Sequence, residues 1–152
     1  MFLETKIPPP AVTVVVALAM WGISLFSPQL VVSSAIRLSL SLAIVVVGGG
    51  FGVAGVLSFR HAHTTVNPTK PERASALVNT GIYRYTRNPM YLGLSCFLVA
   101  WAVFLASAWA LLGVAGFVLY MSRFQITPEE RALSALFGSE YASYKATVRR
   151  WL

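Results

Sequence analysis

Four apolar stretches separated by polar segments dominate the pattern of hydrophobic and polar positions along the chain. They cover residues 11–26, 35–59, 90–105 and 109–124. About 20 apolar residues suffice to cross a bilayer, so the first stretch is short for a span and the second can cross with tilt. Only residues 106–108 separate the third and fourth stretches. This short join predicts either a tight hairpin or one bent re-entrant unit.

The polar segments carry an excess of basic residues. Residues 58–88 hold Arg60, Lys70, Arg73, Arg84 and Arg87 against Glu72 alone, and further cations follow Tyr120. Lys6 lies near the N-terminus, whereas Arg37 falls on the opposite side. Cytosolic segments retain Lys and Arg, so this asymmetry predicts that residues 60–89, residues 125–152 and both termini lie in the cytosol. Four crossings are consistent with that topology.

Composition narrows the class of protein. Of the 152 residues, 57% are hydrophobic and 11% are charged, whereas soluble domains carry about 25% charged residues. The net charge of +7 is therefore read as a cytosolic basic face rather than as a nucleic-acid surface. Cys96 is the single cysteine, and His61 and His63 lack a third partner of clear spacing. No disulfide within the chain and no metal site are expected.

The glycine-rich run GGGFGVAG, residues 48–55, lies inside the second apolar stretch. A nucleotide-binding glycine loop needs a preceding strand and a following helix, which a membrane span does not offer. Gly48 and Gly52 are four residues apart, a spacing that lets helices approach closely in lipid. We expect this face to pack either within the chain or against a second copy, which leaves the oligomeric state open.

Two helices are expected after the last apolar stretch. TPEERALSALFG predicts a helix with Thr127 as N-cap, Glu130 completing a capping box and Gly138 at the C-terminal end. In SEYASYKATVRRWL, an aromatic and apolar stripe lies beside basic residues; its members are Tyr141, Tyr144, Val148 and Trp151. That pattern is typical of an interfacial helix on an anionic membrane surface.

The segment GIYRYTRNPMYLG, residues 81–93, concentrates polar residues at the start of the third stretch. A structural interpretation suffices for it alone: Asn88 caps a helix beginning at Pro89, Arg84 and Arg87 reach lipid phosphates, and the tyrosines form an interfacial belt.

A hairpin of the third and fourth stretches adds a second interpretation. It would bring the first polar group, Arg87, Asn88 and Tyr91, close to a second one, Arg123, Glu129 and Glu130. A pocket with both charge signs and aromatic walls suits a zwitterionic ligand that carries an aromatic base.

Two quoted motifs carry a resemblance to a known family. LVNTGIYRYTRNPMYLG (residues 77–93), followed by EERALSALFGSEYASYKATVRRWL (residues 129–152), resembles the isoprenylcysteine carboxyl methyltransferase and phospholipid methyltransferase family. TTVNP (residues 64–68) is similar to small bacterial members, whereas the first two apolar stretches match only in being apolar. The family consists of integral membrane enzymes that use S-adenosylmethionine.

The resemblance implies site residues by position. Those lining an S-adenosylmethionine pocket would be Leu77, Val78, Tyr83, Arg87, Asn88, Pro89, Met90, Tyr91 and Glu129. Those with a catalytic role would be Arg123, as an acceptor contact, together with Glu129 and Glu130.

The sequence also departs from the family. The eukaryotic isoprenylcysteine enzymes have histidine-proline where this chain has Asn88-Pro89, and an upstream histidine where it has Ser75. Asparagine donates a hydrogen bond but carries no charge, so the methyl acceptor stays open. A carboxylate acceptor needs no general base, whereas an amine must lose a proton, to Glu129, Glu130 or a tyrosine.

We therefore predict an all-α integral membrane protein with one domain, residues 1–152, and four transmembrane helices. The cytosolic loop and the C-terminal helices would form the cofactor pocket, and the resemblance to small bacterial members implies a bacterial inner membrane. The predicted activity is methyl transfer from S-adenosylmethionine to a lipophilic acceptor, an isoprenylcysteine-like carboxylate or a phospholipid amine, that enters from the bilayer. The alternatives are a non-enzymatic scaffold or lipid-binding protein, and a sterol-reductase-like enzyme that uses NADPH.

Overall fold

The computed structural model describes residues 6–62 and 76–152, and within them every regular element is a helix. The α-helices are α1 (Pro9–Phe26), α2 (Ser34–His61), α3 (Pro89–Phe104), α4 (Leu111–Tyr120) and α5 (Thr127–Thr147). Two 3₁₀ turns, η2 (Gly81–Arg84) and η3 (Ala108–Ala110), and a π-helical segment, η4 (Met121–Ile126), complete the order. The sequence predictions on His63, residues 64–68, Lys70, Glu72, Arg73 and Ser75 lie outside the described residues.

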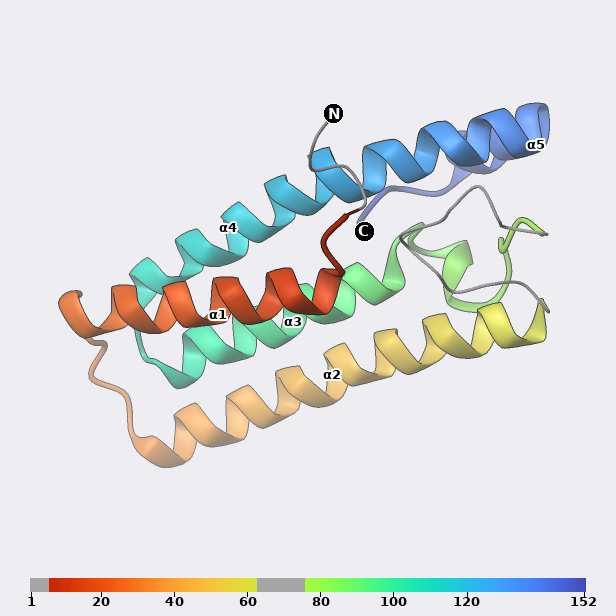
Figure 1. Cartoon of the computed structure of the whole chain (residues 1–152). Coiled ribbons are helices and arrows are strands. Elements are labelled where there is room, and N and C mark those ends of the chain that lie inside the picture. Colours follow the sequence, from red (N-terminus) through yellow and green to blue (C-terminus); the bar gives the residue numbers. More distant parts are fainter. Residues whose placement is uncertain (1–5, 63–75) are drawn as a thin grey trace.

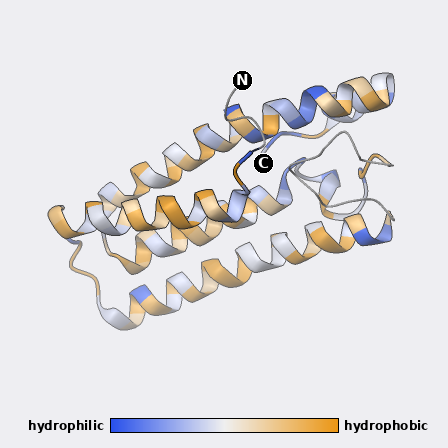
Figure 2. Cartoon of the chain, in the orientation of Figure 1, coloured by the Kyte–Doolittle hydropathy of each residue, from blue (hydrophilic) through white to orange (hydrophobic). Residues whose placement is uncertain are grey.

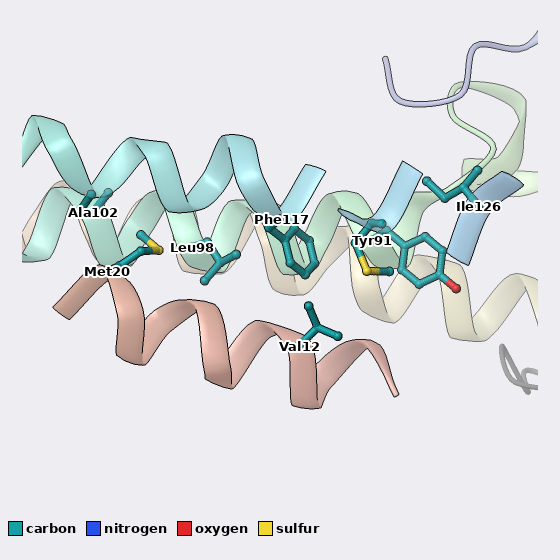
Figure 3. Packing of buried hydrophobic residues seen from close by; sticks show 9 residues of the cluster. Val12, Met20, Tyr91, Leu98, Ala102, Phe117 and Ile126 are labelled. Carbon is teal, nitrogen blue, oxygen red and sulfur yellow. The ribbon is translucent and has the colours of Figure 1, made fainter. Parts of the chain in front are cut away.

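Helix α3 lies at the centre of the bundle (Figure 1). Helix α2 packs along one side of it, and α1 and α4 pack against its other side. The core between α1, α3 and α4 is built from apolar side chains such as Met20, Leu98 and Phe117, which point into the space between the helices (Figure 3). Because α3 contacts all three neighbours, its first turn is fixed in position at the polar end of the bundle.

The crossing of α2 and α3 depends on two glycines. A methyl group at Gly93 would lie 2.6 Å from the Gly48 carbonyl oxygen, and one at Gly48 would lie 2.8 Å from Cβ of Cys96. Both distances are too short for a real side chain, so the two backbones touch directly, as small residues allow in membrane helices. Of the two predicted partners for Gly48, the structure shows packing within the chain.

The connection between α3 and α4 is a tight turn. Ala106 adopts a positive φ of 50°, a conformation that L-residues rarely adopt. Its carbonyl oxygen accepts a hydrogen bond from the Leu30 backbone N–H at 2.7 Å, and the Ser107 and Ser27 hydroxyl oxygens lie 2.8 Å apart. Contacts from the segment between α1 and α2 therefore hold the hairpin that the short join predicts.

The prediction that Thr127 begins a separate helix is wrong. Thr127 has helical angles, φ −61° and ψ −44°, and its hydroxyl donates to the Ser122 carbonyl at 2.7 Å instead of capping. Pro128 cannot donate to the preceding turn, and the wider π-helical turn η4 accommodates it, so the helix runs from Ala108 to Thr147. Gly138 does interrupt the helix, with φ 49° and ψ −119°, as its position in the sequence predicts.

The predicted interfacial helix at the C-terminus is also wrong. Tyr141 and Tyr144 are buried against Val78 and Tyr83 instead of facing a membrane surface. The helix ends at Thr147, and Val148 is extended, with φ −116° and ψ 133°. The chain then turns back, since Trp151 packs against the core between α1, α3 and α4.

Among residues 6–62 and 76–152, three helices are long and apolar enough to cross a membrane: α1, α2 and the continuous helix Ala108–Thr147. Helix α3 is apolar but shorter, at 16 residues. Figure 2 shows hydrophobic residues along α1 and α2 and hydrophilic ones gathered on α5 and at the end of α2. In the continuous helix the charged residues begin at Arg123, so α5 lies beyond its apolar part. The protein is thus a membrane protein with one polar end.

Candidate functional site

The segment before α3 is anchored by a cluster of tyrosines. Tyr83 is buried and meets the Phe59 ring edge to face, with ring centroids 5.4 Å apart. The Tyr144 hydroxyl donates to the Tyr83 carbonyl oxygen at 2.7 Å. Gly81 begins the turn with a φ of 58°, and its missing side chain leaves room for the Ser58 hydroxyl. Two predicted pocket residues, Leu77 and Val78, pack in this same cluster.

Glu130 lies at the centre of an ion cluster. Its carboxylate accepts hydrogen bonds from Arg87 at 2.8 Å and from Arg150 at 2.6 and 3.1 Å, and Lys145 lies 3.8 Å away. Burial raises the pKa of Glu130, but the hydrogen bonds from Arg150 and Arg87 outweigh burial and hold that pKa below its usual value. This glutamate is therefore ionised and paired at neutral pH.

The ion cluster holds the end of the chain in place. We call residues 148–152 the C-terminal strap. The Arg87 backbone N–H donates to the Arg149 carbonyl at 3.0 Å, and its guanidinium donates to the Val148 carbonyl. The Asn88 side-chain amide donates to the Arg150 carbonyl at 2.8 Å, and the Trp151 indole N–H to the Ser122 hydroxyl. The strap therefore lies against the start of α3.

Arg87 and Asn88 have roles that their positions in the sequence did not reveal. Asn88 precedes Pro89 as predicted, but its side chain makes no capping hydrogen bond to α3. Its backbone N–H donates to the Thr86 hydroxyl, and its amide binds the strap. Arg87 divides its donors between Glu130 and backbone carbonyls of the C-terminal region. Sequence patterns carry no signal for contacts between irregular segments this far apart.

Glu129 has surroundings opposite to those of its neighbour. Its carboxyl accepts a hydrogen bond from the Tyr91 hydroxyl at 2.5 Å, which joins α5 to the first turn of α3. Burial and the nearby Glu130 charge raise the pKa of Glu129 to about 8, although the Tyr91 hydrogen bond opposes them. Burial, with Tyr144 and Glu129 nearby, also raises the pKa of Tyr83. The predicted hairpin has thus brought Tyr91 and Glu129 together.

Gln125 is a site residue that sequence reasoning missed. It lies one helical turn before Glu129, is 1% exposed, and donates its amide to the Ile7 carbonyl at 2.7 Å. Within the described residues its side-chain oxygen has no hydrogen-bond partner. A buried acceptor without a partner calls for a donor from a ligand or water. A glutamine directly after an apolar stretch, four residues before a glutamate, was the available signal.

The remaining predicted residues lie in the first turn of α3 and in η4. Pro89 is buried at the start of α3, and Met90 packs over Gly55 of α2. Arg123 is exposed, with its guanidinium carbon 5.8 Å from the Phe124 ring centroid. Tyr91 and Met90 also line an apolar groove of about 580 Å³ between α1, α2 and α3. Tyr91 therefore belongs both to the hydrogen bond with Glu129 and to the lining of the groove.

Comparison with known proteins gives three findings. A model of the phospholipid methyltransferase family matches residues 36–140. A Haemophilus influenzae protein described as uncharacterized is 49% identical over 63 residues, which are 41% of this chain and all of that protein. Protein-S-isoprenylcysteine O-methyltransferase of Saccharomyces cerevisiae is 31% identical over 91 residues, 58% of this chain and 37% of the yeast enzyme. No solved structure matches the chain.

Proposed function

Because the chain belongs to the phospholipid methyltransferase family, we propose that it transfers a methyl group from S-adenosylmethionine to a lipophilic acceptor at the membrane surface. The observation that carries this proposal is the acceptor pair formed by the buried Gln125 and the half-buried Glu129. Four residues apart, they share one face of the helix. That face meets Tyr91, where the polar end of the bundle joins the apolar groove.

The residues present fit the proposed cofactor. S-adenosylmethionine carries a sulfonium and an ammonium, and when bound it supplies an activated methyl group. Among residues 6–62 and 76–152, the group that lowers the pKa of Glu129 is the neutral hydroxyl of Tyr91. A cationic ligand would stabilise the ionised form of such a carboxyl. The side-chain oxygen of Gln125, which has no partner among the described residues, can accept an N–H. Aromatic rings such as those of Tyr83 and Tyr91 attract cations and stack on bases.

We assign the predicted site residues to two groups. Glu129, Tyr91, Tyr83 and Met90, with Gln125, would contact the cofactor, and Arg123 would contact the acceptor. A second group would hold the first in position through the buried tyrosine cluster, the start of α3 and the strap; it comprises Leu77, Val78, Arg87, Asn88, Pro89 and Glu130. Well-oriented reactants can lower a barrier by about 7–11 kcal/mol, so positioning would be the main task of this site.

The topology supports a lipophilic acceptor. We propose that α3 crosses with α4 as a hairpin, which makes four crossings with both termini and the polar end in the cytosol. An acceptor could then reach Tyr91 sideways from the bilayer. The name of the yeast relative specifies O-methylation of protein-S-isoprenylcysteine, and the name of the family specifies phospholipids. If the acceptor is an amine, Glu129, with a pKa near 8, is suited to take its proton.

A binding titration tests the proposal. Purified protein in detergent is titrated calorimetrically with S-adenosylhomocysteine, and separately with NADPH. We expect micromolar binding of S-adenosylhomocysteine that weakens about 10- to 100-fold in Glu129→Gln, because one charge-assisted hydrogen bond is lost. Glu140→Gln is the matched control, since Glu140 is an exposed acid on the same helix.

Three outcomes would contradict the proposal. Absence of S-adenosylhomocysteine binding by folded protein would favour the scaffold or lipid-binding alternative. NADPH binding in its place would favour the reductase alternative. An equal loss in Glu129→Gln and Glu140→Gln would remove the assigned site while leaving the family intact.

A further inference from the structure

An apolar groove of about 580 Å³ runs between the start of α1 and the facing sides of α2 and α3. Its walls include Pro9, Val53, Leu57, Leu94 and Phe97. Among the described residues, the charged one in the lining is Arg60, near the end of α2, and the one with a hydroxyl group is Tyr91. The groove is therefore amphipathic along its length, with its apolar part towards the middle of α2 and α3 and its polar groups at the end where the candidate site lies.

The glycines of α2 that line this groove differ in what surrounds them. Gly48 touches α3 directly, so its role is helix packing. A methyl group at Gly49 or Gly52 would meet no atom within 4 Å, although both residues line the groove. Glycine is among the least favourable residues inside a helix. At these two positions close packing gives no reason for it, and the bare backbone instead widens the groove.

The length of the groove matches one lipid leaflet. Its lining on α2 extends from Gly48 to Arg60, twelve steps along the helix, which at 1.5 Å each is about 18 Å. Half of a hydrocarbon core is about 15 Å. An apolar chain anchored at Arg60 would thus run parallel to the neighbouring lipid chains and end near Gly48, where α2 and α3 close together.

The polar end of the groove favours an anionic head group. Arginine binds carboxylate and phosphate oxygens through two parallel hydrogen bonds, and Arg60 lies at the edge of the apolar lining with its side chain exposed. Tyr91 lines the same groove and donates to Glu129. A head group held here would lie beside the residues assigned to methyl transfer.

We propose that this groove binds the apolar chain of a single-chain amphiphile with an anionic head group, and that Gly49 and Gly52 set the width of chain it accepts. The identification of this amphiphile as the methyl acceptor rests on the proposed function; the binding itself does not. Gly49 and Gly52 are then residues that determine acceptor specificity, and Arg60 positions the head group.

Photo-cross-linking tests the groove. Full-length protein in phosphatidylcholine nanodiscs is incubated with a palmitic acid that carries a diazirine, irradiated, and mapped by peptide mass spectrometry. We expect saturable labelling on the peptides that contain Val53, Leu94 and Phe97. Gly52→Leu should reduce labelling about tenfold, and Gly52→Ala by less, because their side chains occupy the groove.

Gly50→Leu is the matched control. Gly50 lies on the same helix, is exposed and does not line the groove, and a methyl group added there would meet no atom within 4 Å. The two leucine substitutions therefore have the same effect on helix propensity and differ in whether they enter the groove. Labelling should be unchanged in Gly50→Leu, and equal labelling in Gly50→Leu and Gly52→Leu would overturn the proposal.

Competing probes test the head group and the number of chains. Unlabelled palmitic acid and lysophosphatidic acid should compete, whereas hexadecanol and two-chain phosphatidic acid should compete at least tenfold less well. The preference for the acids over hexadecanol should vanish in Arg60→Gln. If hexadecanol competes equally well in the wild type, the proposed preference for an anionic head group is wrong. If phosphatidic acid competes equally well, the proposed preference for a single chain is wrong.

S-adenosylhomocysteine binding, measured in the same samples, separates this proposal from the proposed function. Gly52→Leu should bind S-adenosylhomocysteine as tightly as wild type does, which also shows that the variant is folded. Labelling as expected without S-adenosylhomocysteine binding would refute the methyltransferase function and leave the groove assignment standing. S-adenosylhomocysteine binding with no labelling of the groove peptides would refute the groove assignment alone.

Discussion

Glu129 and Glu130 are adjacent on one helix, yet they belong to regions of opposite character. Glu130 is surrounded by Arg87, Arg150 and Lys145. Burial raises its pKa, but Arg150 and Arg87 outweigh burial and hold that pKa below the usual value. Glu129 is hydrogen-bonded to the Tyr91 hydroxyl, and burial raises its pKa to about 8. Successive residues of a helix point about 100° apart, so one faces the strap and the other faces α3.

The difference shows how two neighbouring glutamates of one helix can have different roles, one in stabilising the fold and one in binding a ligand. A carboxylate whose charge is fully paired holds segments together but has little left to offer a ligand. A buried carboxyl that lacks a cation is costly to ionise, and a cationic ligand would reduce that cost. Strongly perturbed carboxyls of this second kind are found most often at functional sites. We therefore propose that Glu130 stabilises the fold and that Glu129 binds a ligand.

The largest expected effect is the loss of the Glu130 ion cluster. Glu130→Ala leaves Arg87, whose side chain is 9% exposed, without its carboxylate. Removing one partner of a buried pair costs about 3–5 kcal/mol, and because Arg150 and Lys145 are partly exposed we expect about 3 kcal/mol. Thermal unfolding in detergent measures the change, with the exposed Glu140→Ala as control. A melting temperature close to that of the control would show that the strap is held by its backbone contacts alone.

The second effect is a difference in pH dependence. The pKa of Glu129 is raised from 4.5 in the unfolded chain to about 8, so its contribution to stability is complete below pH 4.5 and is lost as the pH rises towards 8. The loss has a limiting slope of about 1.4 kcal/mol per pH unit, and about 1 is expected here. The pKa of Glu130 is lowered, so its contribution is present above pH 4.5 and is lost in acid.

Melting temperatures between about pH 2 and pH 9 measure both contributions. Glu129→Gln should flatten the decline between pH 5 and 8 and leave the acid side unchanged, whereas Glu130→Ala should remove the loss of stability in acid. Within the described residues, Tyr91 and Glu130 act directly on Glu129, and Tyr83 and Tyr141 interact with its charge. Burial raises the pKa values of Tyr83 and Tyr141, so these two tyrosines stay neutral throughout this range. A decline that persists in Glu129→Gln would assign the slope to another group.

Much of the fold follows from the sequence because apolar runs are local signals. The four apolar stretches correspond to α1, α2, α3 and the first part of the continuous helix, and their ends agree within a few residues. The short join between the third and fourth stretches also predicts that Tyr91 comes close to Glu129. Gly138 was recognisable because only a residue tolerant of positive φ suits that position.

The division of roles between Glu129 and Glu130 could not be predicted. It depends on the rotation of α5, and the π-helical turn at Met121–Ile126 shifts that rotation away from a regular helical period. The strap was missed for another reason. Its contacts join residues about sixty positions apart through backbone carbonyls, which no side-chain pattern records. Tyr141 and Tyr144 follow a membrane-surface pattern, but the tyrosine cluster with Tyr83 buries them.

The smallest expected effect tests whether Asn88 stabilises the fold, as Glu130 does, or binds the ligand, as proposed for Glu129. The family resemblance places Asn88 in the cofactor pocket, whereas its amide donates to the Arg150 carbonyl in the strap. Asn88→Ala removes one hydrogen bond, so we expect a loss of about 1 kcal/mol in stability. S-adenosylhomocysteine affinity, measured calorimetrically, should fall less than threefold. A tenfold or larger fall in affinity with little change in melting temperature would instead assign Asn88, like Glu129, to ligand binding. The strap would then line the pocket and not merely support the residues that do.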